Sequence, residues 1–231
     1  YRFGDTRVMS APTDVIQSKP HIPFRYYYCW ANEDWTRAWD GKTNDVILKQ
    51  DYSDETIERI VQDLVIASRD NRYLRIDEKP VFAIYQFDKL PNASEFVSAL
   101  RAKALEEIGT DLIIACTYND NYRVDWSQIA DIVVQFPPHR MPRKTKRVLI
   151  PADQMPESNP ETADFFESYD QVSKQALEAL SSVDKLHAGV CPDWDNTARR
   201  AKNANILVGS TPEKFSDWAR RAAQDVSTRF S

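Results

Sequence analysis

Apolar and polar positions alternate along the chain in blocks that predict strands and helices in turn. Short, continuous apolar runs are typical of parallel strands buried on both faces. Such runs indicate strands at 22–29, 81–85, 112–117, 132–136, 186–191 and 206–208. Between them, apolar residues recur every three to four positions, as on the buried face of a helix. This order of strand and helix predicts an α/β fold with a parallel sheet.

Local signals place the ends of the helices. Residues 1–19 are expected to form a loop and a short helix, with Pro12 in the first turn of that helix. Ser53 can cap a helix whose apolar stripe follows, and Asn92 or Ser94 can cap the next one. Further helices are expected at 170–181 and after Thr211.

The chain of 231 residues shows no linker, so we expect a single domain over 1–231. Its one long irregular segment is a proline-rich loop at 137–163, with six prolines between 137 and 160. The loop carries a basic patch made of Arg140, Arg143, Lys144, Lys146 and Arg147. This patch is either a solvated face or a contact surface for an anionic glycan or a protein partner.

Composition and charge exclude several classes of protein. A net charge of −5 argues against nucleic acid as a partner. With five glycines and no phosphate-loop motif, no nucleotide cofactor is expected. Three widely spaced cysteines favour free thiols in the cytoplasm over disulfides or a metal site. No apolar run approaches the roughly 20 residues of a membrane span.

Two polar segments rich in aromatic residues carry the candidate chemistry. They lie at 30–41 and 192–200, and each directly follows a predicted strand. Function gathers at the carboxyl ends of parallel strands. Aromatic rings can stack on the C–H face of a sugar, while amides, carboxylates and guanidinium groups bind its hydroxyls. The alternative is that these rings belong to the core and the charges form structural ion pairs.

The first segment, from Trp30 to Gly41, resembles the signature of the WbsX-like family, which is similar to glycoside hydrolase family 99. Further matches follow in order along nearly the whole chain. They are Gln50-Asp51-Tyr52, Asp70, Arg72-Tyr73, Ile76-Asp77, Lys79-Pro80, Phe136-Pro137-Pro138, 194–200 and 210–213. The chain departs from the family pattern at Asp34, where Asn is more frequent, and at Glu78, where Gly is usual.

The resemblance implies a (β/α)8 TIM barrel that acts on glycans encoded in bacterial polysaccharide loci. It also implies that strands are missing at both ends, since relatives begin with two further strands and end with a strand that carries a catalytic pair of glutamates. The expected fold is therefore an incomplete barrel with about five main parallel strands. No residue of this chain inherits the role of those glutamates.

The resemblance and the chemistry together give a set of candidate substrate-binding residues. They are Trp30, Asn32, Glu33, Trp35, Arg37, Trp39, Tyr85, Trp194, Asp195, Asn196, Arg199 and Arg200. Glu33 and Asp195 are the candidate catalytic carboxylates, because glycoside cleavage needs two carboxyl groups. The structural alternatives are ion pairs of Glu33 with Arg37 and of Asp195 with Arg199.

Three functions remain open at this point. The first is a carbohydrate-active domain that acts on glycosidic bonds, as a hydrolase or as a glycosyltransferase that uses a sugar nucleotide. The second is a non-catalytic glycan-binding module. The third is a protein-interaction domain that uses the basic loop. The expected partner is thus a glycan or a sugar nucleotide.

Overall fold

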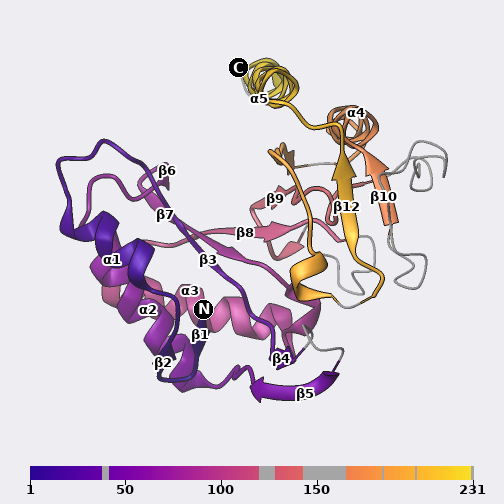
Figure 1. Cartoon of the computed structure of the whole chain (residues 1–231). Helices are drawn as coiled ribbons and strands as arrows, with labels where there is room; N and C mark the ends of the chain where they lie inside the picture. The colour runs from indigo at the N-terminus through magenta and orange to yellow at the C-terminus, as the bar shows by residue number, and fades with distance from the viewer. Residues whose placement is uncertain (38–41, 120–127, 143–164, 184, 201, 230–231) are drawn as a thin grey trace. The chain divides into compact units, whose positions relative to one another are not determined.

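The computed structural model describes residues 1–37, 42–119, 128–142, 165–183, 185–200 and 202–229. These residues form two compact units, and each is described by itself. Unit 1 contains residues 1–35, 48–117 and 121–132, and unit 2 contains residues 36–47, 118–120 and 133–231. Both units combine strands with helices, whose labels are given in Figure 1.

The core of unit 1 is a parallel sheet of β3 (Tyr28–Trp30), β7 (Lys79–Ile84) and β8 (Ile113–Thr117). Every residue of β7 from Val81 onward is buried, as the continuous apolar run predicts. A short strand, β6 (Arg75–Ile76), pairs antiparallel with β7 through a two-residue turn. The parallel α/β class is therefore confirmed.

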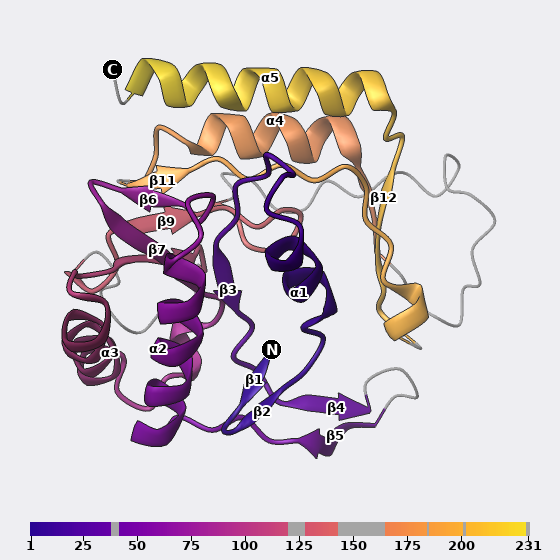
Figure 2. The ribbon, with the colours of Figure 1, turned by 90° about the vertical axis from the view of Figure 1, so that its left-hand side faces the viewer.

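Two long helices, α2 (Asp54–Ser68) and α3 (Ala93–Ile108), lie side by side in unit 1 (Figure 2). Their caps are those predicted from the sequence: Ser53 Oγ accepts from the Thr56 amide, and Asn92 Oδ1 accepts from the Glu95 amide. Gly109 ends α3 with a φ of +83°, which a side chain would disfavour. Phe96 and Leu100 lie on the buried face of α3, whereas Leu105 near its end is 57% exposed.

The start of unit 1 forms a small hairpin and a short helix. The hairpin pairs β1 (Arg2–Phe3) with β2 (Thr6–Arg7), and α1 (Ala11–Ser18) follows with Pro12 in its first turn, as predicted. The strand predicted at 22–29 is wrong in extent, because β3 begins only at Tyr28. Two prolines, Pro20 and Pro23, cannot donate to a strand ladder, and the residues around them are exposed.

Unit 2 contains two pairs of parallel strands. β9 (Ile132–Val134) pairs with β11 (Leu186–His187), and β10 (Phe165–Ser168) pairs with β12 (Asn205–Val208). β10 was not predicted from the sequence. The strand predicted at 186–191 is too long, because β11 ends at His187. Gly189, just past β11, approaches β9 so closely that a Cβ there would lie 2.2 Å from the carbonyl oxygen of Gln135.

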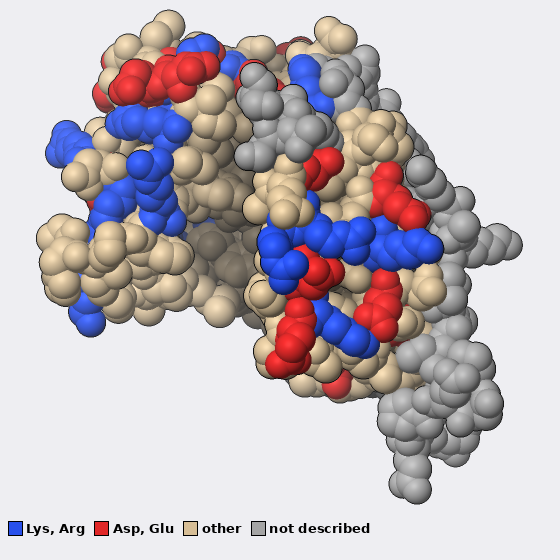
Figure 3. Space-filling model, turned by 90° about the horizontal axis from the view of Figure 1, so that it is seen from above, with Lys and Arg blue, Asp and Glu red and all other residues tan. Residues whose placement is uncertain are grey.

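Two helices of unit 2, α4 (Tyr169–Ala179) and α5 (Pro212–Arg229), run side by side (Figure 2). Their shared core contains Tyr169 and Trp218, whose rings meet edge to face at 5.6 Å. Opposite charges alternate over these helices (Figure 3), for instance Lys214 with Asp170 at 2.8 Å. This outer face is therefore a solvated surface with paired charges.

The hairpin of β4 (Trp35–Arg37) and β5 (Lys42–Leu48) was also missed, because its aromatic and charged residues lack a strand period. The described strands form open sheets, and none of these sheets closes into a barrel. Most of the proline-rich loop, 143–163, lies outside the described residues, as do the basic residues Arg143, Lys144, Lys146 and Arg147.

Candidate functional site

The residues that follow β3 and β7 meet at one edge of the unit 1 sheet, because these strands are parallel and adjacent. Asn32 lies two residues past β3 and is fully buried. Its Nδ2 donates to the carbonyl oxygen of Gln86 at 2.7 Å, and its Oδ1 accepts from the Gln86 amide at 2.7 Å. The Asn32 side chain therefore joins the ends of two strands.

Glu33 lies beside this junction with its side chain partly exposed. Gln86 Nε2 donates a hydrogen bond to Glu33 Oε2. Gln86 itself is only 7% exposed, so it presents its amide to the carboxylate from a buried position. The carboxylate therefore has a fixed partner at the edge where a substrate is expected to bind.

Two further side-chain hydrogen bonds support this edge. Tyr52 donates to the carbonyl oxygen of Asn32 at 2.9 Å, and Thr117, at the end of β8, donates to the carbonyl oxygen of Tyr85 at 2.5 Å. Burial raises the pKa of Tyr52 to about 12, so its hydroxyl stays protonated and remains a donor. Tyr85 is partly exposed at the same strand end.

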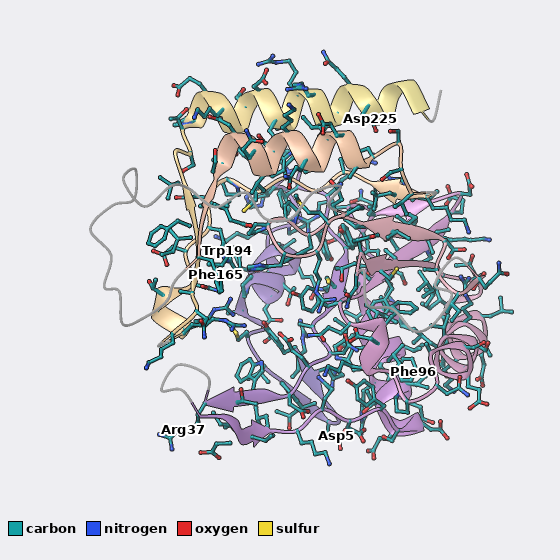
Figure 4. All side chains as sticks on the ribbon, turned by 90° about the vertical axis from the view of Figure 1, so that its right-hand side faces the viewer. Asp5, Arg37, Phe96, Phe165, Trp194 and Asp225 are labelled. Carbon is teal, nitrogen blue, oxygen red and sulfur yellow. The ribbon has the colours of Figure 1, made fainter. Side chains whose placement is uncertain are left out.

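Trp30 and Trp35, the two candidate tryptophans in unit 1, have different environments. Trp30 is 4% exposed, stacks on Phe96 of α3 at 5.6 Å and donates its indole N–H to the carbonyl oxygen of Arg2. Figure 4 labels Phe96 on its helix. Trp35 is only partly buried and meets Tyr1 and Phe3 edge to face. Trp30 thus packs in the core, while Trp35 keeps an accessible ring surface.

Unit 2 brings a second group of candidate residues together around Trp194, which Figure 4 labels close to β10 and β12. The guanidinium carbon of Arg199 lies 5.8 Å from the centre of the Trp194 ring, and His139 meets that ring edge to face at 4.9 Å. The Trp194 Nε1 is buried and has no hydrogen-bond partner among the described residues. An aromatic ring beside a guanidinium group suits a sugar or a phosphate.

The side chains of Asp195 and Asn196, which follow Trp194, accept hydrogen bonds from nearby backbone amides. Asn196 is 6% exposed, and its Oδ1 accepts from the Asn205 amide at 2.7 Å. Asp195 is exposed, and its Oδ1 accepts from the Thr197 amide at 2.8 Å, which forms a local turn. Arg200 is also exposed.

The structure therefore divides the predicted set. One group, in unit 1, contains Trp30, Asn32, Glu33, Trp35 and Tyr85. The other, in unit 2, contains Arg37, Trp194, Asp195, Asn196, Arg199 and Arg200, and Trp39 lies outside the described residues. Arg37, labelled at the β4–β5 hairpin in Figure 4, pairs with Asp45 at 3.5 Å.

Sequence reasoning missed two residues of these groups, Gln86 and His139. Gln86 follows directly on Tyr85, so its position at a strand end was a usable signal. His139 stands in the proline-rich loop, and only the fold brings it to Trp194.

The described part of the chain holds no group of three or more His, Cys, Asp or Glu side chains that could bind a metal ion. Cys116 and Cys191 are buried, and burial raises the pKa of Cys116 to about 12, so this thiol stays protonated. Within the same residues, no helix has the length and apolar character needed to cross a bilayer.

Comparison with known families decides the class of protein. The family model described as "Glycosyltransferase WbsX" matches residues 1–231. This chain belongs to the WbsX glycosyltransferase family. Membership of this family makes it a carbohydrate-active, glycan-related protein.

Two relatives of this WbsX family member are each named "Uncharacterized protein WxcX". They come from Xanthomonas campestris pv. campestris, strains ATCC 33913 and B100. Each is 25% identical to the chain over 230 residues, which is 97% of the chain and 32% of the relative. The chain thus spans about a third of the length of these relatives. No solved structure matches it.

Proposed function

We propose that this chain forms the sugar-binding part of an enzyme that makes or breaks glycosidic bonds in bacterial cell-surface polysaccharide metabolism. The observation that carries the proposal is the partly exposed Glu33 carboxylate, held by Gln86 at the carboxyl edge of a parallel sheet. The proposal includes a single (β/α)8-type domain that contains both units and is completed by segments outside this chain.

In this proposal Glu33 accepts hydrogen bonds from sugar hydroxyls, and the accessible ring of Trp35 stacks on the C–H face of the sugar. Tyr85 directly follows the adjacent strand β7 at the same edge of the sheet and contributes a further polar contact. Trp30 and Asn32 do not contact the sugar in this proposal. They hold the backbone of the site in place, since both are buried and bonded to backbone groups.

A binding experiment tests the sugar site in the full-length protein. Wild type, Glu33→Gln and Trp35→Ala are titrated with bacterial polysaccharide fragments, neutral trisaccharides of mannose, glucose and galactose, and a trimer of galacturonic acid. We expect each substitution to weaken binding about tenfold or more, because Glu33→Gln removes a hydrogen bond to a charged group and Trp35→Ala removes the ring that stacks on the sugar. Glu58→Gln, at an exposed position of α2, is the matched control and should bind as wild type does.

The outcomes separate the candidate functions. Binding with turnover supports an enzyme, and binding without turnover supports a non-catalytic module. If the wild-type protein binds none of these sugars, or if Glu33→Gln binds as well as wild type, the proposed site is wrong.

Glycosyl transfer from a sugar nucleotide is the second candidate, and the placement of Arg199 over Trp194 favours it. A guanidinium group binds a diphosphate through paired hydrogen bonds, and an indole ring can stack on a base or a sugar. The test is a titration with uridine diphosphate. Arg199→Ala should abolish binding, whereas Arg220→Ala, at an exposed position of α5, should not. Equal binding by both variants would remove this candidate.

A further inference from the structure

The arrangement around Gln86 goes beyond the proposed sugar site on which it rests. Gln86 is almost fully buried, and its backbone is fixed in both directions by Asn32, with two hydrogen bonds of 2.7 Å. A residue held in this way cannot move freely when a ligand arrives. Its side chain then donates to Glu33 Oε2.

We propose that Gln86 is the positioning residue for the Glu33 carboxylate, and that the site it builds takes an uncharged sugar. The Gln86 amide holds Oε2, so that the second oxygen, Oε1, accepts from a hydroxyl of the ligand. The orientation of the carboxylate is set before binding, which lowers the entropic cost of binding.

The amide side chain of Gln86 is the reason why we expect an uncharged sugar. A lysine or arginine at position 86 would also hold the carboxylate, but it would neutralise the charge. Glutamine donates a hydrogen bond and adds no charge, so Glu33 keeps its full strength as an acceptor for hydroxyl groups.

Further carboxylates surround the same edge. Asp34 follows Glu33 directly in the chain and Asp88 lies two positions after Gln86, and both contribute to raising the pKa of the Tyr52 hydroxyl, as Glu33 does. Tyr52 itself bonds the carbonyl oxygen of Asn32. A uronic acid or a phosphorylated sugar would meet this concentration of negative charge and be repelled.

The decisive variant is Gln86→Glu, which replaces the amide by a carboxyl group of nearly the same shape. Two carboxyl groups in contact share one proton at low pH, because each disfavours ionisation of the other. At about pH 5 the shared proton restores a hydrogen bond to Glu33, and at about pH 8 the two charges repel. Gln86→Ala restores nothing at either pH.

The test is binding of the neutral trisaccharides at both pH values in the full-length protein. Gln86→Glu should bind at least tenfold more weakly than wild type at pH 8 and recover most of that loss at pH 5. Gln86→Ala should be weak throughout. Gln62→Glu, which adds the same charge at an exposed position of α2, should follow wild type at both pH values. Because burial alone also favours the protonated form of a Glu at position 86, the double variant Gln86→Glu/Glu33→Gln is compared with Gln86→Glu, and an equally large recovery at pH 5 in both would show a structural role and overturn the inference.

Thermal unfolding without sugar tests the contact itself. The melting temperature of Gln86→Glu relative to wild type should fall between pH 5 and pH 8, and that of Gln62→Glu should not. A difference for Gln86→Glu that does not depend on pH would show that the residue does not face Glu33, and would overturn the inference.

The remaining outcomes distinguish this inference from the proposed function. Sugar binding that depends on Glu33, with no recovery of Gln86→Glu at pH 5, overturns only the role of Gln86. Preference for the galacturonic acid trimer overturns the assignment of an uncharged sugar. If wild type binds no sugar at all, the proposed function fails and this inference fails with it.

Discussion

Asn32 gives the sharpest contrast between a role read from the sequence and a role set by the fold. The sequence places it in the sugar-binding motif, but in the structure both polar atoms of its side chain bond to the backbone of Gln86. In Asn32→Ala the buried amide of Gln86 loses its partner, while its carbonyl oxygen keeps only the hydrogen bond from the Lys89 amide at 3.2 Å. We therefore expect a loss of folding stability, and not only a loss of sugar binding.

The magnitude follows from the two bonds. Each buried backbone group left without a partner costs roughly 1–3 kcal/mol. One group without a partner, the Gln86 amide, and the loss of one of two bonds at the carbonyl oxygen give a destabilisation of about 2 kcal/mol, or a drop of roughly 4–8 °C in melting temperature for a domain of this size. The free energy of unfolding is measured by urea denaturation, followed by tryptophan fluorescence.

Asn92→Ala is the matched control, because Asn92 is exposed and only caps α3, which should cost about 1 kcal/mol. Asn32→Asp adds a test by pH. Its carboxylate can still accept from the Gln86 amide, but only the protonated acid can donate to the carbonyl oxygen. Burial raises the pKa of an unpaired carboxyl group, so Asn32→Asp should lie closer to wild type at pH 4 than at pH 7.

One result would refute this reasoning. If Asn32→Ala loses no more stability than Asn92→Ala and yet loses sugar binding, then the Asn32 side chain faces the ligand and not Gln86.

Three further predictions follow from local geometry. Glu78 adopts a φ of +63° in the turn before β7, so Glu78→Gly should stabilise the protein by about 1 kcal/mol in urea denaturation, and a loss of stability would contradict strain at this turn. Gly189→Ala places a methyl group 2.2 Å from the Gln135 carbonyl oxygen and should cost about 2 kcal/mol or more; an unchanged melting temperature would contradict that close approach. Hydrogen bonds from Arg72 hold the pKa of Asp70 at about 2, so the carboxylate stabilises the fold above pH 4 and loses this effect as the pH falls toward 2. The stability difference between wild type and Asp70→Asn should therefore shrink over that range, and a constant difference would argue against the pairing.

Helix ends and buried strands were predictable because their causes are local. Ser53 and Asn92 cap helices through backbone groups only three residues away, and Gly109 supplies the positive φ that ends α3. The apolar run of β7 needs burial on both faces whatever its neighbours are. The strand at 22–29 was overestimated because aromatic content outweighed the two prolines within and before it.

The candidate site was predictable only as a set of residue types. The motif identified Trp30, Asn32, Glu33 and Trp35 together, but it did not show that the first two are buried and bonded to backbone groups. Gln86 lies just past the end of β7, more than fifty residues after Glu33 in the chain. Its contact with Glu33 exists only because β3 and β7 are adjacent and parallel.

The sequence by itself determined the class of protein, the parallel α/β pattern, most helix ends and the aromatic, carboxylate-rich segments. The class of protein follows from the motifs that match the WbsX family, and the other features follow from composition, periodicity and interactions between near neighbours in the chain. Only the tertiary structure decided which side chains support the site and which face the ligand edge. Asn32 and Glu33 are adjacent in sequence, yet one is fully buried and the other is partly exposed, because burial depends on the strand that packs beside them.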